Sequence, residues 1–299
     1  MKSRPAIRNL LEYSLALGVL KTLEYSPRPV AWRLARAYTN LLDRAIPRLR
    51  KTALRNLALA FPEKTAAERA AIADGVFRSI ARLIFTLSRF GHIRRENISG
   101  WIRFEGIEHV EAGLRAGNGV LFATAHLGNW ELSAFAYGLV KAPMQVIVRP
   151  LDNPLIDRMV ARRRSLSGNR LLEKQDFARA ILKALRANEA VGILIDQNAS
   201  LEQGVFVDFF GVPACAGTGF AKLAVRSGAA VVPGFALWSE AERRYVLRFY
   251  PPVEISGDAE ADTRRLHRQL EEVIREYPDQ WLWIHRRWRT RPPGEPPIY

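Results

Sequence analysis

A histidine and a carboxylate stand close together in the segment AHLGNWE, residues 125–131, where four residues separate His126 from Glu131. A carboxylate that accepts a hydrogen bond from one ring nitrogen fixes the tautomer of an imidazole and makes the other nitrogen a better base. If Glu131 turns back toward His126, the two resemble a catalytic triad without its nucleophile. The hydroxyl of a substrate then takes the nucleophile's place, and an acyl group passes to it from a thioester without a covalent enzyme intermediate. We expect His126 and Glu131 to be the catalytic residues.

The residues around this segment predict how the histidine is positioned. The run GVLFATA, residues 119–125, predicts a buried strand that ends just before His126. Gly128 permits a tight turn, and Asn129 is a good N-cap for a helix over 130–140. Asn129 is also expected to help bind the substrate. Ligands of such sheets bind beyond the carboxyl ends of the strands, which is where His126 would lie.

Two further strands are predicted at 144–148 and 190–195, and each is followed by a charged residue. Arg149 follows the first strand, and its guanidinium is suited to binding phosphate, although an ion pair with Asp152 or Asp157 is an equal alternative. Asp196 follows the second strand and belongs to the expected substrate-binding set. It is expected to orient an arginine rather than to contact the substrate.

A run of three arginines, residues 162–164, falls within a helix predicted over 154–166. The run is either a solvated helix face or a binding site for phosphate or a carrier protein. Arg164 is the member expected to help bind substrate, and Asp196 is expected to orient it or Arg149.

The sequence lacks the motifs of several other kinds of active site. The sequence contains no G-x-S-x-G nucleophile elbow and no H-E-x-x-H zinc motif. Its single cysteine, Cys215, lies among small apolar residues and is expected to be a buried hydrophobe. We expect no metal and no cofactor.

The charge of the chain limits the classes of partner that it is expected to bind. There are 45 Lys and Arg against 30 Asp and Glu, a formal net charge of +15. Such a surface attracts nucleic acid, an anionic membrane or an acidic protein. Zinc-finger spacing and RNP-like aromatic motifs are missing from the sequence, so nucleic acid is not expected to be a partner.

The chain divides into two expected regions. Residues 1–95 predict a helical, membrane-associating region interrupted by Pro27, Pro47 and Pro62, with a capping box at Thr65 and Glu68. The apolar stretch 10–23 is too short and too charged to be read as a spanning helix. It is either an amphipathic helix at the membrane interface or a helix packed on the domain, the two being equal alternatives.

Residues 96–299 predict an α/β domain, because short apolar runs alternate with helices. The expected fold is a central mixed, largely parallel sheet flanked by helices. Further strands are predicted at 229–235 and at 244–250, the latter as an edge strand, with helices at 177–187, 220–227 and 262–276. Phe206, Phe209 and Phe210 either line an acyl slot or pack in the core.

These residues carry a resemblance to a known family. HLGNWE is similar to the H-x4-D/E motif of the glycerolipid acyltransferases. The whole chain resembles the bacterial lipid A biosynthesis late acyltransferases, which add lauroyl or myristoyl chains. The blocks that carry this second resemblance occur in order: RNLALAFPE (55–63), VRPLDNPLID (148–157), IDQNASLEQGVFVDFFGVPA (195–214), SGAAVVPGF (227–235) and WLWIHRRWRTRP (281–292).

The resemblance implies an acyltransferase on the cytoplasmic face of the inner membrane, peripheral or with a single N-terminal anchor. The acyl donor would be acyl carrier protein or acyl-coenzyme A, and the acceptor a hydroxyl of a lipid A precursor. Another membrane lipid is the alternative acceptor: a lysophospholipid, an ornithine lipid or a phosphatidylinositol mannoside. In the family's pattern His126 and Glu131 match the catalytic dyad, Asp196 matches an acidic position, and Arg164 falls near a functional arginine.

Overall fold

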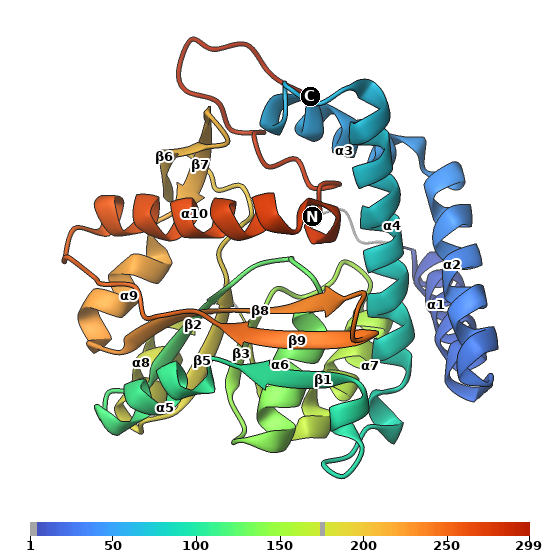
Figure 1. Ribbon diagram of the computed structural model, residues 1–299, viewed down its shortest axis with the longest axis horizontal. Helices are drawn as coiled ribbons and strands as arrows, with labels where there is room; N and C mark the ends of the chain where they lie inside the picture. Colours follow the sequence, from blue (N-terminus) through green and yellow to red (C-terminus); the bar gives the residue numbers. More distant parts are fainter. Residues whose placement is uncertain (1–4, 174–176) are drawn as a thin grey trace.

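A seven-stranded sheet forms the centre of the molecule, in the order β1-β9-β8-β2-β5-β3-β4 (Figure 1). The computed structural model describes residues 5–173 and 177–299. The strands of the sheet are β1 (Ile102–Glu105), β2 (Val120–Thr124), β3 (Gln145–Val148), β4 (Arg170–Glu173), β5 (Ala190–Leu194), β8 (Ala230–Ser239) and β9 (Arg244–Phe249). Neighbouring strands are parallel except β8 and β9, which are antiparallel. The predicted mixed, mostly parallel sheet is confirmed.

Helices cover both faces of this sheet. On one face α5 (Ile107–Arg115) and α6 (Trp130–Val140) pack against the central strands. On the other face lie α8 (Phe177–Arg186), α9 (Gly219–Ser227) and α10 (Ala259–Glu276). The remaining helix of this part, α7 (Pro154–Arg164), packs against α6. Apolar residues on both faces of β2 and β5 follow from this coverage, because a doubly covered strand is buried on each side.

Four helices precede the sheet: α1 (Ala6–Tyr25), α2 (Arg28–Ala45), α3 (Pro47–Ala60) and α4 (Ala66–Ser88). The breaks between them fall at the predicted prolines, and the predicted capping box opens α4. α4 runs along the side of the sheet, and α1 and α2 pack on its outer surface (Figure 1). Within the described residues, no helix has both the length and the apolar character needed to cross a membrane.

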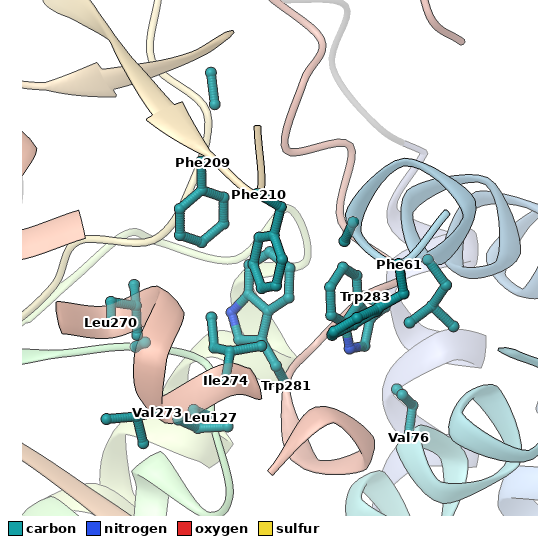
Figure 2. Packing of buried hydrophobic residues seen from close by; sticks show 14 of the residues in the cluster. Phe61, Val76, Leu127, Phe209, Phe210, Leu270, Val273, Ile274, Trp281 and Trp283 are labelled. Carbon is teal, nitrogen blue, oxygen red and sulfur yellow. The ribbon is translucent and has the colours of Figure 1, made fainter. Parts of the chain in front are cut away.

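A large aromatic core joins these helices to the strand ends. Phe61 of the α3–α4 connection packs against Trp283 and Phe210, with ring centroids 5.7 Å and 5.4 Å away (Figure 2). Trp281 and Trp283 belong to the segment that follows α10, and both are fully buried. The C-terminal segment is therefore an integral part of the core that supports the carboxyl ends of the strands.

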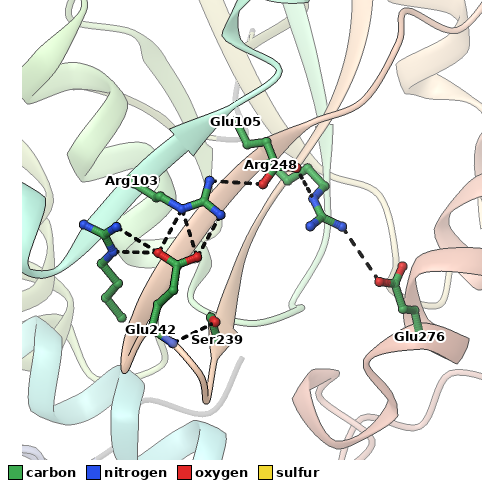
Figure 3. A network of polar contacts seen from close by, with 7 residues as sticks. Arg103, Glu105, Ser239, Glu242, Arg248 and Glu276 are labelled. Atoms are coloured by element: carbon green, nitrogen blue, oxygen red, sulfur yellow. Dashed lines mark hydrogen bonds and ion pairs between the residues drawn. The ribbon is translucent and has the colours of Figure 1, made fainter.

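The strand β9 is not at the edge of the sheet, which corrects the prediction for residues 244–250. It lies between β8 and β1, and β1 is the edge strand on that side of the sheet. The sequence did not reveal β1 because it has only four residues, with alternating apolar and charged side chains. A polar network lies along this edge: Arg103 of β1 donates hydrogen bonds from Nε and Nη2 to Glu242 of the β8–β9 turn (Figure 3).

One further pair of strands stands outside the main sheet. The antiparallel hairpin β6 (Gly204–Phe209) and β7 (Val212–Gly217) follows the end of β5 and packs against α10. It carries two of the phenylalanines that were candidates for an acyl slot. Phe209 and its neighbour Phe210 are buried in the aromatic core, so the core-packing alternative is the one the structure supports.

Candidate active site

Two parallel strands bring His126 and Asp196 face to face. β2 and β5 pair in register, with Thr124 opposite Leu194 at their carboxyl ends. His126 lies two residues beyond Thr124, and Asp196 lies two residues beyond Leu194. Because the two strands end at the same level of the sheet, residues that lie the same number of positions beyond each strand are neighbours.

The Asp196 carboxylate holds the histidine through both of its oxygens. Oδ1 lies 2.9 Å from Nδ1 of the His126 ring, and Oδ2 accepts a hydrogen bond from the His126 backbone N–H at 3.0 Å. Oδ2 also accepts a hydrogen bond from the indole Nε1 of Trp281, at 2.9 Å. An ionised carboxylate only accepts hydrogen bonds, so Nδ1 carries a proton and Nε2 is left with its lone pair.

The electrostatics of this pair follow from burial and mutual charge. Burial alone would raise the pKa of Asp196, but the charge of His126 and the hydrogen bonds from His126 and Trp281 hold it far below its ordinary value. Burial opposes protonation of the ring, yet the charge and hydrogen bond of Asp196 raise the net pKa of His126 above its ordinary value. Asp196 is thus ionised at neutral pH, and the imidazole is a stronger base than a free histidine.

A tight turn carries the chain from His126 into α6. Gly128 has a φ of +64°, and a β-carbon there would lie 2.0 Å from the carbonyl oxygen of Ala236. Asn129 caps α6, because its side chain accepts a hydrogen bond from the backbone N–H of Leu132 at 3.0 Å. The predicted N-cap is confirmed. Asn129 is completely buried and is not among the residues that line the adjoining cavity, so its role here is to cap the helix, and its part in substrate binding stays a prediction.

Glu131 does not hold the histidine, which corrects the expected dyad contact. Both of its carboxylate oxygens accept hydrogen bonds from Arg164 at the end of α7, at 2.8 Å and 2.6 Å. The physical reason lies in the packing of α6 on α7, which places a guanidinium against the first turn of α6. Glu131 still acts on His126 through its charge, which helps to raise the pKa of the ring. The expectation that Asp196 orients Arg149 or Arg164 is likewise wrong, because its partners are His126 and Trp281.

The three arginines at the end of α7 have different surroundings. Arg164 is largely buried, with 21% of its side chain exposed, and it lines the cavity beside His126. Arg163 points the other way and pairs with Glu24 of α1 at 3.5 Å. The run is therefore not a uniform solvated face, and Arg164 is the member that reaches the site.

His126 opens onto a cavity of about 1090 Å³ at the carboxyl ends of the strands. Glu131, Arg164 and Arg149 also line it. Arg149 is exposed, and it forms no ion pair with Asp152 or Asp157, all three residues being described. Asp157 instead accepts a hydrogen bond from the backbone N–H of Leu151, at 2.9 Å.

The walls of the cavity are mostly apolar and come from both faces of the sheet. On the α6 face they include Phe122, Tyr137, Met144 and Phe249, which also belong to the core packed against that helix. On the α9 face they include Phe220 and Leu223. Gly192 widens the α6 side, since a β-carbon there would lie 2.6 Å from Cε of Met144. A cavity with mostly apolar walls and several charged groups suits a ligand with a long hydrocarbon portion and a polar portion.

The C-terminal segment supports this site in a way that the sequence analysis did not foresee. The backbone of Leu282 donates a hydrogen bond to the carbonyl of His126 at 3.0 Å, and Gly128 donates to the carbonyl of Gln280 at 2.9 Å. The equal offset of His126 and Asp196 from two predicted parallel strands was the signal that would have paired them. No comparable local signal exists for Trp281, which lies 85 residues from Asp196 in the chain.

Comparison with known proteins points to one family. The family model described as "Bacterial lipid A biosynthesis acyltransferase" matches residues 1–290. The chain is 32% identical to the lipid A biosynthesis lauroyltransferase of Escherichia coli K12, over 95% of this chain and 94% of that protein. It is 29% identical to the palmitoleoyltransferase of the same organism, over 95% and 92% of the two chains. With the E. coli myristoyltransferase the identity is 27%, over 82% of this chain and 77% of that protein.

Proposed function

The chain belongs to the bacterial lipid A biosynthesis acyltransferase family, and on that premise we propose that His126, held by Asp196, is the general base of its acyl transfer. The protein is an enzyme that transfers an acyl group in lipid A biosynthesis. The proposal concerns how it does so: which residue takes the proton, which donor is used and how the enzyme meets the membrane. The observation that carries it is the 2.9 Å contact between Nδ1 of His126 and Asp196, made at the wall of the cavity.

The proposed reaction is a direct transfer. Nε2 of His126 removes the proton of an acceptor hydroxyl while that oxygen attacks the carbonyl carbon of an acyl thioester. The tetrahedral intermediate then collapses, the carbon–sulfur bond breaks, and the imidazolium returns its proton to the leaving thiolate. General-base catalysis of this kind contributes roughly 10²–10⁴-fold. The substrate hydroxyl acts as the nucleophile, and no covalent enzyme intermediate forms.

The Glu131–Arg164 pair has a supporting part in this proposal. Arg164 is close enough to His126 that its charge lowers the pKa of the ring, which opposes the effect of Glu131. The same positive charge would stabilise the oxyanion of the tetrahedral intermediate. Glu131 holds the guanidinium with both oxygens and thereby fixes its position. Removal of Glu131 would thus affect the reaction through Arg164.

A further positive charge at the cavity, that of Arg149, suits the substrates that the family implies. Arg149 lines the cavity and is exposed, so its guanidinium is available to a phosphate of the lipid acceptor or of the donor's carrier group. The apolar walls would accommodate acyl chains. Acyl carrier protein and acyl-coenzyme A both present their thioester on an anionic carrier, which the net charge of +15 would attract.

The first helix is the proposed site of membrane contact. Four large apolar side chains of α1 are between half and three-quarters exposed, namely Ile7, Leu10, Leu11 and Leu15. The helix adjoins the cavity: the side chain of Asn153 donates a hydrogen bond to the carbonyl of Asn9 at 2.9 Å, and exposed Leu151 lies two residues before Asn153 at the cavity wall. Apolar side chains on a strongly basic protein favour the surface of an anionic membrane. We place this contact on the cytoplasmic face of the inner membrane.

The test of the reaction uses purified enzyme, an under-acylated lipid A precursor, and the same acyl chain carried either by acyl carrier protein or by coenzyme A. Mass spectrometry measures whether the precursor gains one acyl chain. We expect transfer from at least one donor, and the faster donor identifies the natural one. Failure with both donors, by an enzyme that is folded and bound to vesicles, would contradict the proposal.

The test of membrane contact uses vesicles that contain an anionic lipid. Replacing Leu10 and Leu15 with glutamate removes two apolar anchors, and we expect binding to fall roughly 10- to 100-fold. Val225→Glu on α9 is the matched control, because Val225 is also exposed and lies on another helix. Equal binding by the double variant and the control would contradict this use of α1.

A further inference from the structure

The segment after α10 runs directly beneath the histidine. It includes the short helix η4 (Pro278–Gln280) and continues through Trp281 and Leu282. Backbone hydrogen bonds join Gln280 to Gly128 and Leu282 to His126, at 2.9 Å and 3.0 Å. The residue between these two anchors is Trp281, so its side chain is placed relative to the His126 loop by bonds on both sides.

The indole of Trp281 is fixed by its packing as well. The side chain is 1% exposed. It meets Trp283 edge to face at 4.6 Å between ring centroids, and it meets Phe209 at 5.7 Å (Figure 2). A large ring held on these sides cannot rotate without disturbing the core. Its Nε1–H is therefore a donor at a fixed position.

This donor is aimed at one oxygen of the carboxylate that holds His126. Oδ2 of Asp196 accepts the bonds from the indole and from the His126 backbone, and Oδ1 is left to face Nδ1 of the imidazole. Because the two oxygens have different partners, the plane of the carboxylate is fixed. Without the indole N–H, the buried carboxylate keeps only one donor on Oδ2 and loses the contact that opposes its rotation.

We propose that Trp281 is a positioning residue of the acyl transfer, which acts by fixing the Asp196 carboxylate in the orientation that directs Oδ1 to the His126 ring. The inference rests on the proposed role of His126 and adds a third member to the pair. Trp281 does not line the cavity, so it would act through Asp196 and would not contact substrate.

Other charged and titratable groups also face the pair. Glu131 and Arg164 act on His126 from the cavity side. Asp196 also interacts with His267 of α10 and with His285 and Arg287 of the C-terminal segment. A substitution of Trp281 leaves all five groups in place, so a change in the titration of His126 would report the lost indole bond.

The core provides a matched control for this test. Trp283 is also fully buried, lies two residues away and belongs to the same aromatic cluster. Its indole N–H donates to the backbone carbonyl of Pro278, at 2.6 Å. Trp281→Phe and Trp283→Phe therefore remove the same volume and one indole hydrogen bond each, but only the first touches the Asp196 carboxylate.

The experiment measures kcat, KM and the pH profile of both variants in the full-length enzyme. For Trp281→Phe we expect kcat to fall about 10-fold, the effect of losing a hydrogen bond to a charged group, with KM unchanged. The acidic limb of the profile should move to lower pH, because a carboxylate that rotates away from the ring stabilises the imidazolium less. Trp283→Phe should leave this limb in place. Equal losses of activity and an unmoved limb in both variants would overturn the proposal.

An isosteric analogue covers the case in which Trp281→Phe does not fold. Incorporation of 3-benzothienylalanine at position 281 keeps the size and shape of the ring and replaces the N–H by sulfur. We expect the same fall in kcat and the same shift of the acidic limb. Wild-type kinetics in this analogue would overturn the role of Trp281 alone, whereas a wild-type enzyme that transfers no acyl group would instead contradict the proposed function.

Discussion

Replacing Asp196 with asparagine should move the proton of the His126 ring from Nδ1 to Nε2. The hydrogen bonds around the carboxylate explain this change of tautomer. An amide has one oxygen and one NH2 group, so one of the two carboxylate positions must become a donor. At the Oδ2 position the NH2 group would face two N–H donors, those of His126 and Trp281. At the Oδ1 position it would face only the Nδ1 atom of the ring.

The second orientation is favoured by about two hydrogen bonds, or about 2 kcal/mol, which is a factor of about 30. In that orientation the amide donates to Nδ1, so the ring must carry its proton on Nε2. The atom that should accept the hydroxyl proton then has no lone pair. We expect turnover by Asp196→Asn to fall roughly 10²–10⁴-fold, the full contribution of general-base catalysis.

Two measurements check this prediction. Acyl transfer is followed by mass spectrometry of the lipid product, and the tautomer of His126 is read from nitrogen chemical shifts of protein labelled in histidine. Glu131→Gln is the matched control, because it removes another carboxylate of the same cavity that makes no hydrogen bond to the ring. We expect the control to keep the proton on Nδ1. Asp196→Asn protein that retains a tenth of wild-type turnover, or keeps that tautomer, would refute the reasoning.

Three further predictions concern the surroundings of the histidine. Glu131→Ala leaves Arg164 largely buried and unpaired, so the free energy of unfolding, measured in urea, should fall by about 3 kcal/mol. Adding Arg164→Ala to the same chain should restore part of this loss, and equal stability of Glu131→Ala and wild type would contradict the prediction. Gly128→Ala would place its β-carbon against the carbonyl of Ala236 at a positive φ, so thermal melting should show a loss of about 2 kcal/mol or more, and an unchanged melting temperature would exclude the strain. The pKa of His126 is raised and the base must be neutral, so kcat/KM should increase with pH through a limb above 6.5, and a limb below 6.5 would show that another group titrates.

Much of the fold could be predicted from local pattern. The helix at 130–140 and its Asn129 cap follow from residue type and spacing, and the structure reproduces both. Buried parallel strands such as β2 are recognisable as short apolar runs. The edge of the sheet was not predictable in this way, because β1 is short and half-exposed and its pairing with β9 depends on which distant segment lies beside it.

The position of His126 at a strand end was predictable, but the carboxylate that holds it was assigned to the wrong residue. Glu131 is near His126 in the chain, and both this spacing and the resemblance to the H-x4-D/E motif favoured it. Which carboxylate contacts the ring depends on the tertiary packing. Arg164 of α7 binds both oxygens of Glu131, and the register of β2 and β5 brings Asp196 to the ring. Trp281 depends on a still longer connection, through the packing of the C-terminal segment on the aromatic core.

The most direct test of the central claim is the turnover of purified His126→Ala with an acyl thioester and a lipid A precursor. The ring lines the cavity, and in the variant the Asp196 carboxylate would keep the hydrogen bonds from the backbone N–H of residue 126 and from Trp281, so this variant should fold and bind vesicles. We expect its acyl transfer to fall roughly 10²–10⁴-fold at saturating substrate. Near-normal turnover by the folded variant would contradict the assignment of His126 as the base.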